Sequence, residues 1–486
     1  MFFTTYPFIF LFLPLTLLGF HALRQSRHAR FAVHGLVLSS AVFYASLDRL
    51  HLGTLVLSII VNYLLAARLQ ALVWAQAKAV KSFFWMCLSF NAGYLVLFKY
   101  GFPAASLDIP VPLGLSFFTL VQIGVHIAVF TGSASKLSLA SHGLMVGYFP
   151  CVVAGPLVTR QQFDPALFTR PGPVDVTLLL SGLMLFSIGL FKKVMMADSV
   201  ATDVAAAFGA LGTGISLSMG EAWIVAALYT LQLYFDFSGY TDMACGISAM
   251  FGYRLPRNFF SPLKATSIQV YWRRWHMTVT RFFTSNLYLL VTLRLTRWAN
   301  RRRLGPRARF AVTVFGPTFI CFSLIGVWHG SGANFLWFGL LMASAMSIHQ
   351  LWAQRNTPLP RPIGWTLTML VVMAGMILDK TSSGAEALSI FRSMVGLGSV
   401  SVQVLQDSSV VLKLASLALV ALACPNSQQI LSAYQPVVPE AWDDKVGIPR
   451  LMRWTIGARG MAMASLVLVA GLVAIPNAAQ FIYYRF

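Results

Sequence analysis

Apolar residues follow one another along this chain in long runs, and short polar stretches separate the runs. The runs neither alternate with polar residues nor have the spacing of barrel strands. Because backbone groups in lipid must find hydrogen-bond partners within their own segment, we predict that each run is a helix. The runs approach the roughly 17–25 residues that span a membrane, and they cover residues 6–23, 31–47, 51–66, 83–98, 111–130, 176–197, 222–237, 310–327, 333–352, 364–379, 409–424 and 460–480.

Composition supports the same class of fold. Charged residues make up 10% of the 486 residues and hydrophobic residues 57%, a balance that soluble domains do not have. We therefore predict an all-α polytopic membrane protein with about 11–12 transmembrane helices plus re-entrant or interfacial helices. No repeat or long linker divides the chain, so we expect one membrane domain over residues 1–486, with a core at about 112–352 and C-terminal helices at about 364–486.

The five cysteines lie scattered in or beside apolar runs, without metal-like spacing. An odd number cannot pair completely, and we interpret them as small core residues. The sequence therefore predicts no metal site and no permanently bound cofactor.

The net charge of +21 would suggest nucleic acid as the partner of a soluble protein, but Lys and Arg lie mostly in loops between apolar runs. The positive-inside rule explains this placement, so we expect membrane lipid as a partner and no nucleic acid. Arg24, Arg27 and Arg30 put the first loop in the cytoplasm and the N-terminus outside.

The stretch from Arg254 to Arg309 holds thirteen basic residues and no acidic one, although the apolar segment 276–293 interrupts it. Both flanks favour the cytoplasm. We therefore predict that 276–293 is re-entrant or interfacial, with its non-spanning backbone buried in protein. The segment 142–155, which glycine and proline break, is a second candidate of this kind.

Two histidines are candidates for chemistry. His276 ends "YWRRWH", and His329 lies in "GVWHGSGANFLWFG", at the turn between two apolar runs. A neutral imidazole accepts a proton from a hydroxyl at physiological pH and returns it to a leaving group, which acyl transfer requires. The glycines around His329 would let a substrate chain approach the backbone. The alternative is a structural histidine bonded to a carbonyl in a helix turn.

Arginines beside His276 allow two interpretations. The tryptophans and arginines of "YWRRWH" are typical of an interfacial anchor. They also fit a cationic rim at the cytoplasmic mouth of a pocket, where Arg254, Arg257, Arg273 and Arg274 would hold a phosphorylated donor.

Ionisable residues inside spans cost roughly 2.5–3.5 kcal/mol each and are functional candidates by default. Asp236 and Asp242 lie close to Tyr240 in "YFDFSGYTDMACG". We favour pairing of these carboxylates with arginines of the basic region over direct catalysis. Lys192 and Lys193 form a basic pair inside an apolar run, and we interpret them in the same way, as a structural ion pair with Asp198 six residues on.

Several motifs, taken together, resemble the membrane-bound O-acyltransferase family, and within it the bacterial branch that includes the membrane subunit of alginate O-acetylation. The similar pieces run in family order over most of the chain. They are "PLGLSFFTLVQ" at 112–122, "GYFPCVVAGPLV" at 147–158, "GLFKKVMMAD" at 189–198, "YFDFSGYTDMACGISAMFGYRLPRNFFSP" at 234–262, "YWRRWH" at 271–276, "GVWHGSGANFLWFG" at 326–339, "PNSQQIL" at 425–431 and the terminal "FIYYRF".

The resemblance implies a ring of tilted helices around a central tunnel in a bacterial inner membrane. It implies that His329 is the catalytic base and His276 the second family histidine, with acetyl-coenzyme A as cytoplasmic donor. It also implies a periplasmic partner of the SGNH or esterase type and a polysaccharide acceptor. Further residues expected at the site, besides the four arginines, are Trp275, Trp328, Asp236, Tyr240 and Asn334.

The chain departs from the family pattern near this site. Relatives carry "LRDYLYIPLGG" after the histidine of "YWRRWH", whereas residues 283–289 read "FTSNLYL" here. Asp379 and Lys380 stand where relatives have a Phe-Arg pair, and Ala128 replaces an aspartate. Two alternatives remain: a polysaccharide transporter or export channel without catalysis, and transfer of D-alanine or another acyl group to a cell-envelope polymer.

Overall fold

A computed structural model describes residues 1–107, 109–133, 138–398, 409–439, 448–449 and 452–484. Throughout these residues the regular structure is helical, and the only strand-like pairing is one isolated bridge between Pro256 and Val438. The all-α class is confirmed. The last two residues of the motif "FIYYRF" lie outside the described residues.

Nine stretches in the described part of the chain are helical, long and apolar enough to cross a membrane. Two shorter apolar helices cover 115–130 and 410–423, and the remaining predicted run, 222–237, lies within one long helix. The polytopic prediction is therefore confirmed. The nine stretches are Phe8–Gln25, Ala29–Leu47, Leu52–Trp74, Val80–Ala104, Val176–Gly212, Pro306–His329, Ala333–Ala353, Arg361–Lys380 and Ala458–Asn477.

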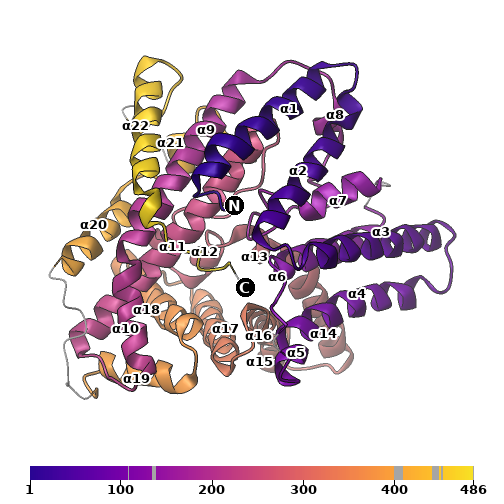
Figure 1. Cartoon of the computed structure of the whole chain (residues 1–486). Helices are drawn as coiled ribbons and strands as arrows, with labels where there is room; N and C mark the ends of the chain where they lie inside the picture. Colours follow the sequence, from indigo (N-terminus) through magenta and orange to yellow (C-terminus); the bar gives the residue numbers. More distant parts are fainter. Residues whose placement is uncertain (108, 134–137, 399–408, 440–447, 450–451, 485–486) are drawn as a thin grey trace. The chain divides into compact units, whose positions relative to one another are not determined.

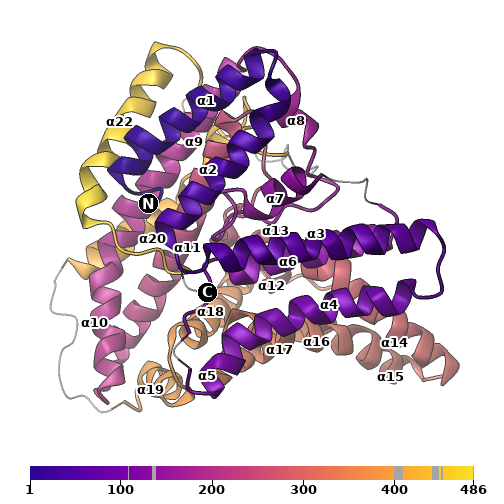
Figure 2. The same cartoon turned by 45° about the vertical axis from the view of Figure 1, so that its right-hand side comes forward.

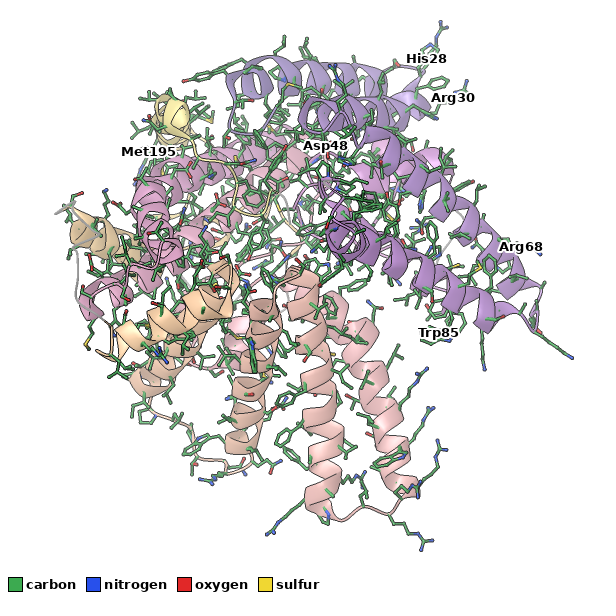
Figure 3. All side chains as sticks on the ribbon, turned by 60° about the horizontal axis from the view of Figure 1, so that its bottom comes forward. His28, Arg30, Asp48, Arg68, Trp85 and Met195 are labelled. Carbon is green, nitrogen blue, oxygen red and sulfur yellow. The ribbon has the colours of Figure 1, made fainter. Side chains whose placement is uncertain are left out.

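The helices leave large apolar side chains on their outer faces. Leu38, Leu466 and Val473 are 66–73% exposed, and Figure 3 shows Trp85 pointing away from its helix. Exposed apolar surface of this extent is unfavourable in water and is what lipid-facing helices require.

The described residues form two compact units. The first comprises residues 1–194, 237–257 and 427–486. It contains α1 (Leu13–Gln25), α2 (Ala32–Leu47), α3 (Leu52–Trp74), α4 (Val80–Val96), α5 (Phe102–Ala104), α6 (Leu115–Phe130), α7 (Leu139–Gly147), α8 (Ala166–Thr169), α9 (Val176–Phe191), the second half of α11 (Met219–Met250), α21 (Ser427–Ile430) and α22 (Ala458–Ala474) (Figure 1).

Glycines let α9 and α11 cross closely in the first unit. A Cβ atom on Gly189 would lie 2.6 Å from the carbonyl oxygen of Gly239, and one on Gly246 would lie 2.5 Å from that of Gly182. Small residues at such crossings allow the backbone-to-backbone packing that stabilises helix pairs in lipid.

The second unit comprises residues 195–236 and 258–426. Three consecutive helices form much of it, and α17 packs against both α16 and α18 (Figure 2). The helices are α10 (Ala201–Gly212), the first half of α11, α12 (Ile268–Trp272), α13 (Met277–Phe283), α14 (Leu289–Arg301), α15 (Pro306–Phe310), α16 (Gly316–His329), α17 (Ala333–Ala353), α18 (Arg361–Lys380), α19 (Gly384–Met394) and α20 (Val410–Ala423).

The two candidates for non-spanning segments differ in structure. Residues 277–301 are helical throughout, because a π-helical turn, Thr284–Tyr288, joins α13 to α14, and this stretch is not among the nine candidate spans. Its re-entrant or interfacial placement stays a prediction. In the segment 142–155, α7 ends at Gly147, and the turns that follow are buried in protein, as irregular backbone at membrane depth has to be.

Candidate active site

His329 ends α16 in the second unit and faces a carboxylate. Its Nδ1 atom lies 3.3 Å from Oδ1 of Asp379, the penultimate residue of α18, and both side chains are largely buried. The phenol of Tyr229 donates to the other oxygen, Oδ2, of Asp379 across 3.3 Å. Because the carboxylate can only accept, the imidazole proton lies on Nδ1, and Nε2 carries the lone pair. His329 is therefore oriented as a base.

Neighbouring side chains hold this pair in place. The side-chain amide of Asn334 donates to the carbonyl oxygens of Leu378 (2.9 Å) and Thr381 (2.7 Å), the residues that bracket Asp379. Asn334 thereby fixes the end of α18 against the start of α17. The rings of Trp328 and Phe338 lie 5.2 and 5.4 Å from the imidazole. Such support limits the movement of a catalytic group.

The glycines of "GVWHGSGANFLWFG" serve the contact between α16 and α17. A Cβ atom on Gly326 would lie 2.2 Å from the carbonyl oxygen of Phe335, and one on Gly330 would lie 2.1 Å from the Phe335 ring. At Gly339, a Cβ atom would meet the carbonyl oxygen of Phe322 at 2.4 Å. The chain's own atoms thus occupy the space that the sequence suggested for an approaching substrate.

His276 has an unusual backbone conformation. It precedes α13 in the left-handed region, with φ 43° and ψ 51°, which few residues other than glycine adopt and which is often found at functional sites. Its Nδ1 atom lies 3.1 Å from Oδ1 of Asn258, and that oxygen also accepts hydrogen bonds from the backbone N–H and the hydroxyl of Thr278. Asn258 is thus the acceptor, so Nδ1 carries the proton.

Burial keeps His276 neutral. Desolvation lowers the pKa of its imidazole well below the usual value, and the charge that His329 would carry lowers it further. The unprotonated nitrogen of a neutral imidazole accepts a hydrogen bond, so His276 can orient a hydroxyl group.

The predicted arginines fall into different units. Arg273 and Arg274 precede His276 in the second unit, where Arg273 is exposed and Arg274 is partly buried. Arg254 and Arg257 belong to the first unit, where Arg254 donates from Nε to the backbone oxygen of Gln435 (2.9 Å) and Arg257 is buried.

The predicted aromatic residues are also divided. Trp275, next to His276, is buried, with its ring 5.0 Å from that of Phe259. Tyr240 belongs to the first unit, where it stacks between Phe3 (5.1 Å) and Phe481 (4.5 Å).

The two aspartates of "YFDFSGYTDMACG" have different surroundings. Asp236 is buried in the second unit. Asp242 lies in the first unit and pairs with Lys192 (2.6 Å), and Gln428 donates to its other oxygen (3.2 Å). The expected arginine partner was wrong for Asp242, because a lysine at the end of α9 occupies that position. Lys192 therefore forms a structural ion pair with Asp242, whereas the expected pairing with Asp198 stays a prediction.

Sequence reasoning missed Asp379 and Tyr229 as members of the site. Asp379 was noticed only as a departure from the family pattern. A signal was present, since it is the only acidic residue between Asp242 and Glu386 and it ends an apolar run. The neighbouring Lys380 lies over the ring of Tyr229, 5.6 Å from its centre.

Comparison with known proteins gives concordant matches. Residues 137–376 match the profile of the membrane-bound O-acyltransferase family, MBOAT. The chain is 32% identical over 444 residues to a protein named peptidoglycan O-acetyltransferase from Helicobacter pylori, covering 82% of this chain and 80% of that protein. It is 29% identical over 420 residues to "Probable alginate O-acetylase AlgI" from Azotobacter vinelandii, covering 82% and 79%. A teichoic acid D-alanyltransferase from Bacillus subtilis is 27% identical over 269 residues, covering 54% and 65%.

Proposed function

Because this chain belongs to the membrane-bound O-acyltransferase family, we propose that it takes an acetyl group from cytoplasmic acetyl-coenzyme A for the O-acetylation of a cell-envelope polysaccharide. Family membership makes it a membrane O-acyltransferase and sets aside the transporter alternative. The observation that carries the mechanism is the contact between Nδ1 of His329 and Asp379 in the second unit.

His329 is the base in this mechanism. Its Nε2 atom removes the proton of an acceptor hydroxyl while the hydroxyl oxygen attacks the thioester carbonyl. The new C–O bond forms, the C–S bond breaks, and the imidazolium returns its proton to the departing thiolate. Asp379 stabilises the positive charge that His329 carries in between and keeps the proton of the resting imidazole on Nδ1.

His276 orients one of the two reactants and stays neutral during the reaction. With Nδ1 bonded to Asn258, its Nε2 atom is an acceptor that can orient a hydroxyl. Arg273 and Arg274, which adjoin it in sequence, are the residues of this unit that we assign to the phosphates of the donor.

The acceptor assignment draws on the relatives. The proteins matched over 82% of this chain are named for O-acetylation of peptidoglycan and alginate, whereas the D-alanyltransferase match covers 54% of it. We therefore favour acetyl over D-alanyl transfer, a bacterial inner-membrane location, and a periplasmic partner of the SGNH or esterase type that receives the acetyl group.

A transfer assay in membrane vesicles tests the function. Vesicles with the wild-type chain should transfer label from acetyl-coenzyme A, labelled in its acetyl group, to the polysaccharide or to the partner protein. The variant His329→Ala should be expressed normally and be inactive. His276→Ala should also be impaired. Label transfer from a D-alanyl carrier protein, but not from acetyl-coenzyme A, would support the alternative. Full activity of His329→Ala would reject the assigned base.

A further inference from the structure

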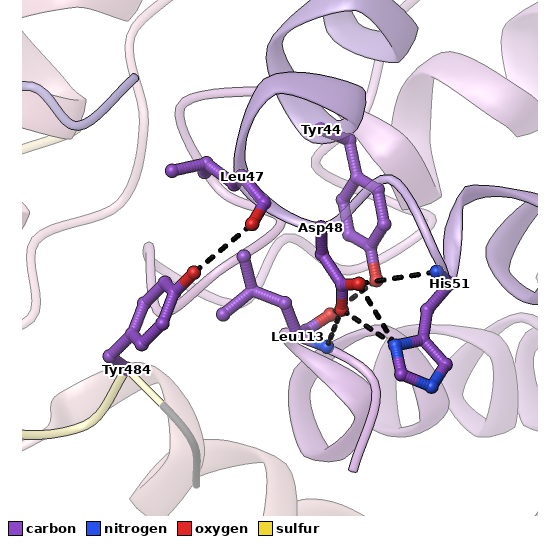
Figure 4. A network of polar contacts seen from close by, with 6 residues as sticks. All are labelled: Tyr44, Leu47, Asp48, His51, Leu113 and Tyr484. Carbon is purple, nitrogen blue, oxygen red and sulfur yellow. Dashed lines mark hydrogen bonds and ion pairs between the residues drawn. The ribbon is translucent and has the colours of Figure 1, made fainter. Parts of the chain in front are cut away.

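A second histidine–carboxylate pair lies in the first unit, at the turn between α2 and α3. Nδ1 of His51 is 2.9 and 3.0 Å from the two carboxylate oxygens of Asp48 (Figure 4). The proton therefore lies on Nδ1, and Nε2 carries the lone pair. Figure 4 shows this second nitrogen pointing away from Asp48.

The pair is rigidly held. The backbone N–H of Leu113 donates to Oδ2 of Asp48 (3.1 Å), and the buried phenol of Tyr44 donates to the carbonyl oxygen of Leu113 (2.9 Å). Asp48 also accepts the backbone N–H of His51 (3.2 Å), the residue before α3. These backbone bonds and the bonds to the imidazole together hold the pair in one orientation, as binding sites do with their polar groups.

The pair lines a cavity of about 260 Å³, together with Arg49 and Tyr484. A second cavity of about 550 Å³ shares Leu47 and Tyr484 with the first and is lined mainly by apolar and aromatic side chains, Phe2, Phe3, Tyr6 and Phe481 among them. Small-molecule sites combine apolar walls with a few placed polar groups in this way. Aromatic faces pack on the C–H surface of a sugar ring, while His, Arg and Asp side chains bind its hydroxyls.

These cavities are expected on the outer side of the membrane, where an exported ligand would reach them. The cytoplasmic loop expected at Arg24–Arg30 precedes α2, so the opposite end of α2 faces outward. The N-terminal amine, also expected outside, lies at that end, 3.3 Å from the carbonyl oxygen of Ser46. Arg30 precedes α2 and Arg68 lies near the end of α3, so both are at the opposite ends of these helices from Asp48. Figure 3 shows both arginines at the edge of this unit.

We propose that the cavity at Asp48 and His51 is a subsite for a hydroxyl-bearing glycan on the outer side of the membrane, the polymer that finally carries the acetyl group. Nε2 of His51 accepts a hydrogen bond from a sugar hydroxyl, Arg49 donates to a second polar group of the sugar, and the aromatic cavity beside Tyr484 holds the next ring. This inference rests on the proposed function for the identity of the acceptor.

Direct binding tests the subsite. Full-length protein with His329→Ala in lipid nanodiscs is titrated with a tetramer of N-acetylglucosamine and a tetramer of a uronic acid, and heat is measured. We expect saturable binding of at least one probe. His51→Gln, which keeps the backbone N–H that Asp48 accepts, should weaken this binding at least fivefold. Arg49→Gln, at an exposed position, should weaken it to the same extent. The matched variants His34→Gln and Arg68→Gln, also exposed, should not.

Two outcomes overturn the subsite: neither probe binds saturably, or His51→Gln binds as tightly as the parent. Thermal unfolding of each variant shows whether a loss of binding reflects a loss of fold. Because the parent protein lacks the base His329, binding is independent of acetyl transfer. Glycan binding without transfer in the wild type would contradict the proposed function alone, and transfer without binding at His51 would contradict this inference alone.

Discussion

Replacing Asp379 by asparagine isolates the contribution of the charge beside His329. Asparagine has nearly the same shape, so it leaves the packing around α18 in place and removes only the negative charge. Across the 3.3 Å that separates Nδ1 from Oδ1, an imidazolium and a carboxylate attract by about 2.5–5 kcal/mol at effective dielectric constants of about 20–40. If His329 becomes charged in the transition state, the substitution lowers kcat by about 10²–10⁴-fold.

The assay is the initial rate of acetyl transfer by purified protein in proteoliposomes at saturating acetyl-coenzyme A. Tyr229→Phe, which removes the hydrogen bond to Oδ2 of Asp379, should cost about 1 kcal/mol, a roughly fivefold effect. Asp203→Asn is the matched control, because Asp203 pairs with Lys413 in the same unit and should retain activity. A rate for Asp379→Asn within threefold of wild type would refute the reasoning.

Three further predictions concern stability, measured by thermal unfolding. In the folded protein the pKa of His276 is lowered, so the stability that its neutral ring contributes is present above pH 6.5 and is lost as the pH falls below that value. The difference in stability between wild type and His276→Asn should therefore shrink from pH 7.5 to pH 5. A constant difference would contradict burial of a neutral ring. Lys192→Met should lower the free energy of unfolding by about 3–5 kcal/mol because it leaves the buried Asp242 unpaired, and the double variant Lys192→Met/Asp242→Leu should recover most of that loss. Equal melting temperatures of the single and double variants would refute the ion pair. Gly326→Ala should destabilise by about 1–3 kcal/mol or more through overpacking, whereas Gly220→Ala, which has open space around it, should melt like wild type or later; a neutral Gly326→Ala would contradict the close contact.

Helix positions could be predicted from the sequence because the membrane removes alternatives. An apolar run in lipid has to form its own hydrogen bonds, so length and composition are enough to place a helix. All of the predicted runs coincide with helical segments. The helix 277–301 was less predictable, because basic flanks indicate which side a segment favours but not how long its helix continues.

The candidate site could be predicted only in part. His276 and His329 were identifiable because each is an ionisable residue in a distinctive motif. Their partners were not, because Asp379 is 50 positions from His329, and one sequence carries no signal that pairs distant residues. The glycines illustrate a different limit: a sequence shows that small residues are needed, but not whether a ligand or the protein's own Phe335 fills the space.

Asp242 shows why charge alone did not identify its partner. The nearest cationic region in sequence is rich in arginine, yet the bond is made by Lys192, which directly follows α9. The close crossing of α9 and α11 at Gly189 and Gly239 brings that lysine into reach. Packing of small residues, which has no charge signature, therefore decides which ion pair forms.

The central claim is that the Nε2 atom of His329 acts as the base in acetyl transfer. The most direct test is the single-turnover rate at which purified His329→Gln, in proteoliposomes, transfers label from acetyl-coenzyme A to an acceptor. Glutamine is similar in reach but cannot accept a proton at neutral pH. We predict a fall of about 10²–10⁴-fold relative to wild type, with donor binding unchanged. A variant that transfers label at the wild-type rate would contradict the account.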